Sequence, residues 1–182
     1  MANSTASPHA PFKSVPYYPP MAINPDAQCH LVISDGSDLP RTQALVSRLA
    51  QTRQVDCLVL GAADSPSLQS LQQVLEQRFA RLHVGVQLHV LGSEAFIWAI
   101  HAQAITNGLS DDEISLCAPT ETVQRPVYCV HCSSVHSHPL ADAVKCPACA
   151  VALEVRGHFS RRLGAYLGVC LNADAPYSEL PA

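Results

Sequence analysis

Charged residues are scarce in this chain, and lysine is almost missing. Only 14% of the 182 residues are charged, the net charge is -4, and lysine occurs only as Lys13 and Lys145. Proteins that bind nucleic acid neutralise its phosphates with clustered lysine and arginine. The composition therefore argues against nucleic-acid binding by the chain as a whole.

Long apolar runs are missing as well. No stretch approaches the ~20 apolar residues that a helix needs to cross a bilayer. The N-terminal run MANSTASPHAPFKSVPYYPP has neither the basic start nor the apolar segment of a secretory signal peptide. We therefore expect a cytoplasmic protein with no membrane association, whose cysteines stay reduced.

Against this background, four cysteines stand out as two CxxC pairs. The runs CVHC and CPAC supply Cys129, Cys132, Cys146 and Cys149. Two thiolates in a tight turn can bind one ion, and a second such turn completes a tetrahedral tetrathiolate site. We predict a zinc ribbon on these cysteines, with two disulfides or buried thiols as the alternative. The remaining cysteines are expected in the core; they are Cys29, Cys57, Cys117 and Cys170.

The bound metal and its role have two alternatives. Pro147 in the second CxxC pair is similar to the pattern of rubredoxin, in which one tetrathiolate iron transfers electrons. The first pair departs from that pattern, because it is followed by Ser133 and Ser134, and zinc is the commoner ion in a ribbon of this kind. A ribbon with basic neighbours can also bind nucleic acid, which is the third interpretation.

The rest of the chain divides by composition. Residues 1–28 are rich in proline and lack apolar periodicity, so we expect an extended arm that is disordered alone or packs along a subunit surface. Residues 29–118 alternate short apolar runs with helical periods, which predicts an α/β domain with a parallel sheet flanked by helices. A polar linker at 119–126 precedes a ribbon domain at 127–182. We expect metal loss to unfold only that second domain.

Within the α/β domain the elements can be assigned individually. Strands are predicted at residues 30–34, 57–61, 86–91 and 114–118. Pro40 suits the first turn of a helix, and a second helix is expected after a Ser65 cap, with an apolar stripe of Leu68, Leu71, Leu75, Phe79 and Leu82. A third, largely buried helix should begin at Ser93 and end at Asn107. His89 and His101 are expected as hydrogen-bonded core imidazoles, so we predict no catalytic residue.

The loop after the first strand is the place where a parallel sheet would bind a ligand. Its run SDGSDLP resembles the glycine-rich turn of the NAD(P)-binding half of ferredoxin reductases, and LGSEAF later in the chain resembles a further segment of that module. Asp35, Gly36 and Ser37 thus form a nucleotide loop, but its carboxylates would repel a pyrophosphate and one glycine is too few. We predict a reductase-like module with an impaired pocket.

The run HFSRRLGAYLGV after the second CxxC pair suits neither a regular strand nor a regular helix. Paired arginines can clamp carboxylates or phosphates, and aromatic side chains anchor interfaces. We therefore predict a docking segment for partner subunits, with a loop that caps the ribbon as the alternative. Its candidate contact residues are His158, Phe159, Arg161, Arg162 and Tyr166.

Together with the CVHC and CPAC motifs and the α/β module, this run resembles the small subunit of dimethylamine monooxygenase, the haem-dependent oxidative N-demethylase. The resemblance spans most of the chain beyond the arm. It implies a complex that uses NADPH and O2 to convert dimethylamine into methylamine and formaldehyde. The resemblance also implies that partner subunits carry the other cofactors: haem in a PAS-like subunit, FMN and a 2Fe-2S cluster in a reductase, and tetrahydrofolate in a third subunit. This chain would be a non-catalytic accessory subunit that carries zinc.

Overall fold

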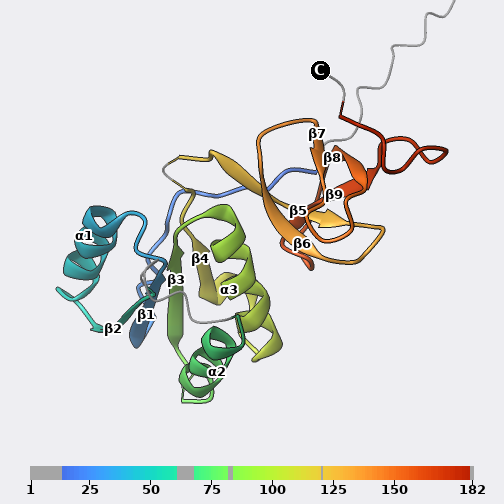
Figure 1. Ribbon diagram of the computed structural model, residues 1–182. Coiled ribbons are helices and arrows are strands. Elements are labelled where there is room, and N and C mark those ends of the chain that lie inside the picture. The colour runs from blue at the N-terminus through green and yellow to red at the C-terminus, as the bar shows by residue number, and fades with distance from the viewer. Residues whose placement is uncertain (1–13, 61–67, 82–83, 120, 181–182) are drawn as a thin grey trace, which may run out of the picture.

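The structure is a computed structural model that describes residues 14–60, 68–81, 84–119 and 121–180 (Figure 1). It contains a four-stranded and a five-stranded sheet, and the cysteine pairs belong to the second. No helix in the described ranges combines the length and the apolar character that a membrane span requires.

The first sheet is parallel throughout. Its strands are β1 (Cys29–Ser34), β2 (Gln54–Val59), β3 (Val86–Leu91) and β4 (Ile114–Leu116), in the order β2-β1-β3-β4. Helix α1 (Leu39–Leu49) covers one face, and α2 (Leu68–Phe79) and α3 (Glu94–Thr106) cover the other (Figure 1). Because β1 and β3 are covered on both faces, they are apolar along most of their length. The predicted mixed α/β fold with a parallel sheet is confirmed.

Most of the helix signals act as expected. Asp38 caps α1 by accepting a hydrogen bond from the Arg41 N–H, and Pro40 lies in the first turn. Ser93 and Asn107 flank α3, and Leu75 and Phe79 of α2 are buried. The predicted cap at Ser65 and the end of the stripe at Leu82 lie outside the described residues, as do the side chains of Leu68 and Leu71.

Strand β2 differs from the prediction. It begins at Gln54, earlier than the apolar run, and Cys57 is exposed instead of lying in the core. As an edge strand, β2 pairs only with β1 and keeps polar residues that obscure its strand pattern. Of the four single cysteines only Cys117 is fully buried, whereas Cys29 and Cys170 are half-buried.

The second sheet contains β5 (Gln124–Cys129), β6 (Val135–Pro139), β7 (Ala143–Lys145), β8 (Ala152–Ser160) and β9 (Ala165–Cys170). The order is β6-β5-β9-β8-β7, and all pairs are antiparallel except β5 with β9. Strand β5 starts inside the predicted linker. The run HFSRRLGAYLGV, expected to be irregular, instead forms the end of β8, a turn and most of β9. An irregular register between Val155 and Phe159 and the positive φ of Gly164 explain its unusual pattern.

The described part of the N-terminal arm, residues 14–28, is extended but lies against the body of the chain. Ser14 forms a β-bridge with His158, and the Tyr18 hydroxyl donates to Glu94 at 3.0 Å. Farther along, the Gln87 side chain donates to the Ala22 carbonyl. These residues therefore connect the two sheets.

Candidate metal centre

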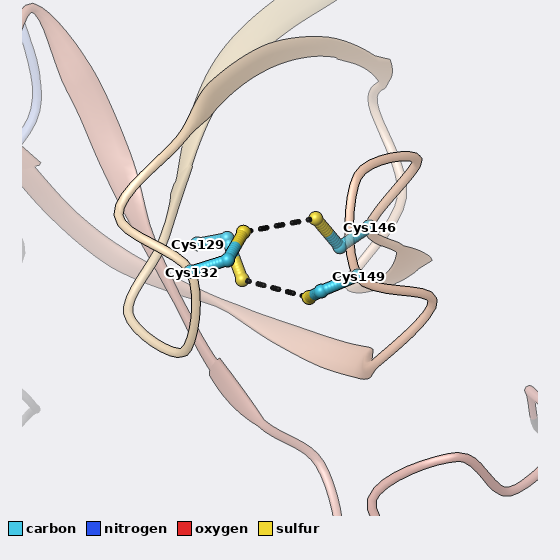
Figure 2. Close-up of side chains that lie close together, drawn as sticks. All are labelled: Cys129, Cys132, Cys146 and Cys149. Atoms are coloured by element: carbon cyan, nitrogen blue, oxygen red, sulfur yellow. Dashed lines mark hydrogen bonds between the residues drawn. The ribbon is translucent and has the colours of Figure 1, made fainter.

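The two CxxC pairs form matching turns. The Cys129 backbone carbonyl accepts a hydrogen bond from the Ser133 N–H, and the Cys146 carbonyl accepts one from the Ala150 N–H, both at 2.9 Å. Ser133 and Ala150 each have a φ of 60°, the left-handed conformation that bends the backbone back around the sulfurs. Two turns of equal geometry thus face each other across a small space lined by sulfur (Figure 2).

The sulfur atoms are spaced as one tetrahedral ion requires. The Cys129–Cys149 and Cys132–Cys146 sulfur pairs are each 3.7 Å apart, and all four sulfurs lie within 4.8 Å of one another. A Zn–S bond of ~2.3 Å in a tetrahedron requires sulfurs about 3.8 Å apart, whereas a disulfide needs ~2.05 Å. No disulfide links any of the cysteines, all of which lie in described parts of the chain. The site therefore fits a tetrathiolate ion and not two disulfides.

The thiol pKa values of Cys132 and Cys149 are shifted in opposite directions. The Ser134 hydroxyl, 2.9 Å from the Cys132 sulfur, is the main reason that the pKa of Cys132 falls to about 6. At Cys149 the Val151 N–H lowers the pKa, but burial and the neighbouring thiols outweigh it and raise the pKa to about 12. Four thiols this close cannot all ionise together unless a cation compensates the charge. The donor set thus fits a divalent metal.

A hydrogen-bonded chain supports the first turn from outside. His136 Nε2 lies 3.0 Å from the Ser134 hydroxyl, which in turn contacts the Cys132 sulfur. Such contacts around a metal ligand fix its orientation and its basicity. The sequence analysis did not predict the contact between His136 and Ser134, although Ser133 and Ser134 directly after the CxxC turn were a signal for polar support of the sulfurs.

The predicted nucleotide loop lies at the carboxyl end of β1, next to the end of β3. Asp35 accepts hydrogen bonds from the Ser37 N–H (2.9 Å) and the Ser93 N–H (2.7 Å). Burial raises the pKa of Asp35, but these hydrogen bonds outweigh it and hold the pKa below its usual range. The carboxylate therefore stays ionised at the start of α3, where a ligand phosphate would otherwise meet free amides.

Close packing keeps that carboxylate in place. A side chain at Gly92 would lie 2.6 Å from the Asp35 carboxyl group, so only glycine allows this approach. A cavity of about 430 Å³ remains beside Gly92 and Ser93, and Arg41 on its border donates to the Ala118 carbonyl at 2.6 Å. The Asp35 carboxylate and the Arg41 guanidinium thus both form hydrogen bonds with groups of this chain.

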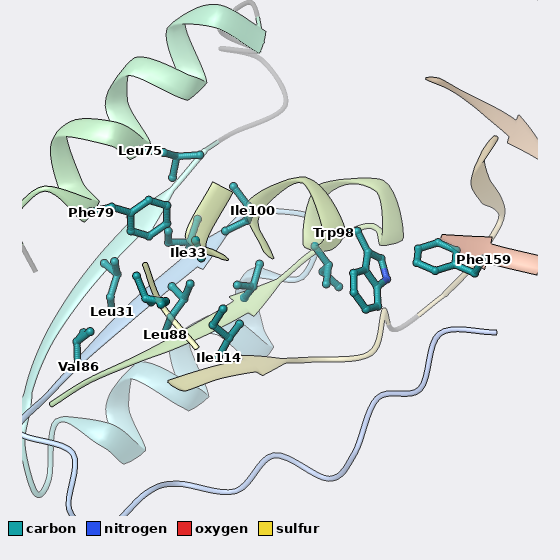
Figure 3. Packing of buried hydrophobic residues seen from close by; sticks show 14 residues of the cluster. Leu31, Ile33, Leu75, Phe79, Val86, Leu88, Trp98, Ile100, Ile114 and Phe159 are labelled. Atoms are coloured by element: carbon teal, nitrogen blue, oxygen red, sulfur yellow. The ribbon is translucent and has the colours of Figure 1, made fainter. Parts of the chain in front are cut away.

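The predicted docking segment makes most of its contacts inside the chain. Phe159 is 3% exposed and packs next to Trp98 (Figure 3). Its ring centroid lies 5.0 Å from those of Trp98 and Tyr166. Arg161 forms an ion pair with Asp111 at 2.8 Å and lies over the Trp98 ring. These side chains join the second sheet to α3, a role that the sequence analysis did not predict.

Two members of the docking segment remain available. His158 and Arg162 are exposed, and docking to a partner stays a prediction for them.

The histidines considered for catalysis behave as expected, because His89 hydrogen-bonds His30 at 3.1 Å and His101 contacts Asp111 at 2.8 Å.

Comparison with known proteins identifies the family. The model of the dimethylamine monooxygenase subunit DmmA-like C-terminal domain matches residues 126–169, which include all four cysteines. The heme-dependent oxidative N-demethylase delta subunit of Ectopseudomonas mendocina (strain ymp) is 42% identical over 174 residues, which cover 96% of this chain and 97% of that protein. The chain belongs to this delta-subunit family.

The resemblance drawn from the cysteine motifs and the run HFSRRLGAYLGV is thereby confirmed. The alignment with the delta subunit extends over the α/β module as well as the metal centre. No solved structure matches the chain.

Proposed function

We propose that this chain is the zinc-carrying accessory subunit of a cytoplasmic, NADPH- and O2-dependent N-demethylase that converts dimethylamine into methylamine and formaldehyde. The observation that carries the proposal is the 42% identity to a delta subunit over almost the full length of both chains. Its partners would be a haem PAS-like subunit, a flavin and 2Fe-2S reductase subunit, and a folate-binding subunit. No nucleic acid or membrane takes part.

The geometry supports a structural role for the ion. All four donors come from protein thiols, and a closed tetrathiolate leaves no open position for a substrate. Cys129, Cys132, Cys146 and Cys149 would hold zinc, which fixes two turns and the strands that follow them. In the α/β module, Asp35 occupies the amide that a nucleotide would need, so we assign NADPH to a partner subunit.

Co-expression tests the accessory role. The full chain, tagged at its C-terminus, is produced with and without the haem, flavin and folate subunits, and each purified sample is examined by native mass spectrometry. We expect one stable complex that demethylates dimethylamine, and no activity from the isolated chain. An active enzyme assembled from the large subunits alone would contradict the proposal.

Metal analysis tests the zinc assignment separately. We expect stoichiometric zinc and a colourless protein. A red protein with visible absorption bands and stoichiometric iron would instead support the rubredoxin-like alternative, in which the same four sulfurs hold an electron-transfer centre. A control with Cys170→Ser should leave the metal content unchanged, because Cys170 lies outside the cluster.

A further inference from the structure

A groove runs along the outer edge of β4. It has a volume of about 480 Å³ and lies between β4 and the N-terminal arm, with Trp98, Phe159 and Arg161 at one end. Figure 3 shows the arm, in blue, passing beside the strand that carries Ile114. The Gln87 side chain donates both to the Ala22 carbonyl of the arm and to the Ser115 hydroxyl of β4, so it fixes one end of the groove.

Backbone groups of β4 face this groove. Strand β4 pairs with β3 on one side only, and the Cys117 N–H donates to the Val90 carbonyl on that side. Because successive residues of a strand direct their backbone groups to opposite sides, the groups of Ile114 and Leu116 point the other way. The Ile114 N–H is taken by the Asp111 carbonyl. The Ile114 C=O and both backbone groups of Leu116 have no hydrogen-bond partner among the residues described.

The arm does not pair with this edge in the part of the chain that the structure describes. Three of the arm residues that line the groove are Pro16, Pro19 and Pro20, which have no N–H to donate. An edge strand with free backbone groups is a template for another strand. The arm therefore lies beside β4 and leaves the Ile114 C=O and the backbone groups of Leu116 unpaired among the residues described.

We propose that the groove receives an extended segment of another subunit, which adds a strand to β4. This inference rests on the proposed function, in which the chain works inside a complex. Backbone pairing at Leu116 would give affinity, as in other cases of strand addition. An apolar side chain of the incoming segment would pack beside Val15 and Tyr17, which line the groove and are exposed, and a lysine or arginine would meet the exposed carboxylate of Asp112.

Hydrogen exchange at single-residue resolution tests the pairing directly. The full chain is measured alone and in the complex with the haem, flavin and folate subunits. We expect the Leu116 amide to exchange fast in the free chain and at least about tenfold more slowly in the complex. The Cys117 amide, already bonded to Val90, should be protected in both states and serves as the internal reference.

A matched pair of variants tests whether the groove itself is needed. Ala22 is exposed and lines the groove, so Ala22→Trp should fill it without disturbing the core. Ala80 is exposed after the end of α2 and does not line the groove, so Ala80→Trp is the control. We expect Ala22→Trp to weaken assembly at least about tenfold and Ala80→Trp to leave it unchanged, a difference of about 1.4 kcal/mol or more.

The possible outcomes separate the two proposals. If the wild-type chain joins none of the large subunits, the proposed function fails and the strand addition fails with it. If the complex forms while the Leu116 amide exchanges as in the free chain, or if Ala22→Trp assembles normally, only the strand addition is overturned. Protection of Leu116 already in the free chain would also overturn it.

Discussion

Phe159→Ala is the substitution that should most strongly separate the two parts of this molecule. Phe159 belongs to β8 of the second sheet, yet its ring lies in the apolar cluster of the first, next to Trp98 (Figure 3). The same ring also contacts Tyr166. The neighbouring ion pair of Arg161 with Asp111 is 60% exposed on both sides, so it adds little to the coupling. Phe159 is therefore the principal link.

The expected loss follows from burial. Truncation of a fully buried phenylalanine to alanine costs about 3–5 kcal/mol of the free energy of unfolding, which includes the cavity that remains. Since Phe159 is only 3% exposed, we expect a value in this range. For a chain of this size, each kcal/mol corresponds to roughly 2–4 °C, so the melting temperature should fall by about 6–20 °C.

Two probes show whether the loss also uncouples the sheets. Trp98 is the single tryptophan of the sequence, so its fluorescence reports on the junction, while release of the metal to a coloured chelator reports on the second sheet. The wild type should lose both signals together in a urea titration, and Phe159→Ala should separate them. Phe79→Ala is the control, because Phe79 is buried in the same cluster away from the junction and should leave the signals coincident. A loss below about 1 kcal/mol with coincident signals would refute the reasoning.

Three further predictions concern the other sites. Cys146→Ser should abolish stoichiometric metal binding and, unlike the local unfolding expected from the sequence, also lower the stability of the α/β module, because Phe159 of β8 is buried in the cluster of the first sheet; zinc analysis combined with a thermal melt measures both. Burial, aided by the charges of His30 and Arg48, lowers the pKa of His89 in the folded chain to about 4. As the pH falls from about 6.5 to 4, His89 is therefore protonated in the unfolded chain before it is protonated in the folded chain, and the folded state loses stability. Up to about 3 kcal/mol of stability should be lost in that window, and His89→Gln should flatten the profile from urea titrations. Calorimetric titration of the isolated chain with NADPH should give no binding heat, and micromolar binding would contradict the role assigned to Asp35.

Local signals predicted the local structure well. The spacing of the CxxC pairs identified all four members of the sulfur cluster, because each pair needs only its own turn to place two sulfurs on one side. Strand β3 matches its predicted bounds, since a strand covered on both faces leaves an uninterrupted apolar run. The left-handed residues Ser133 and Ala150 were not foreseen, because neither is a glycine and the metal turn, not residue preference, sets their conformation.

Contacts between distant segments could not be predicted in the same way. The aromatic and arginine residues of HFSRRLGAYLGV have the composition of a binding surface, and the interpretation as a docking segment was drawn from that composition. It missed that the surface they contact is α3 of the same chain, more than fifty residues earlier. Composition identifies a residue that favours contact, but only the fold shows which surface it meets.

The arm illustrates the same limit and explains why β4 matters. Proline-rich sequence correctly excluded helix and strand from residues 14–28, because proline lacks the amide that both require. In the folded chain the arm lies beside the edge of β4 without a backbone hydrogen bond to Leu116 among the described residues. Pro16, Pro19 and Pro20 have no N–H with which to make one. The edge of β4 therefore stays open beside a groove, which is the arrangement that the proposed strand addition requires.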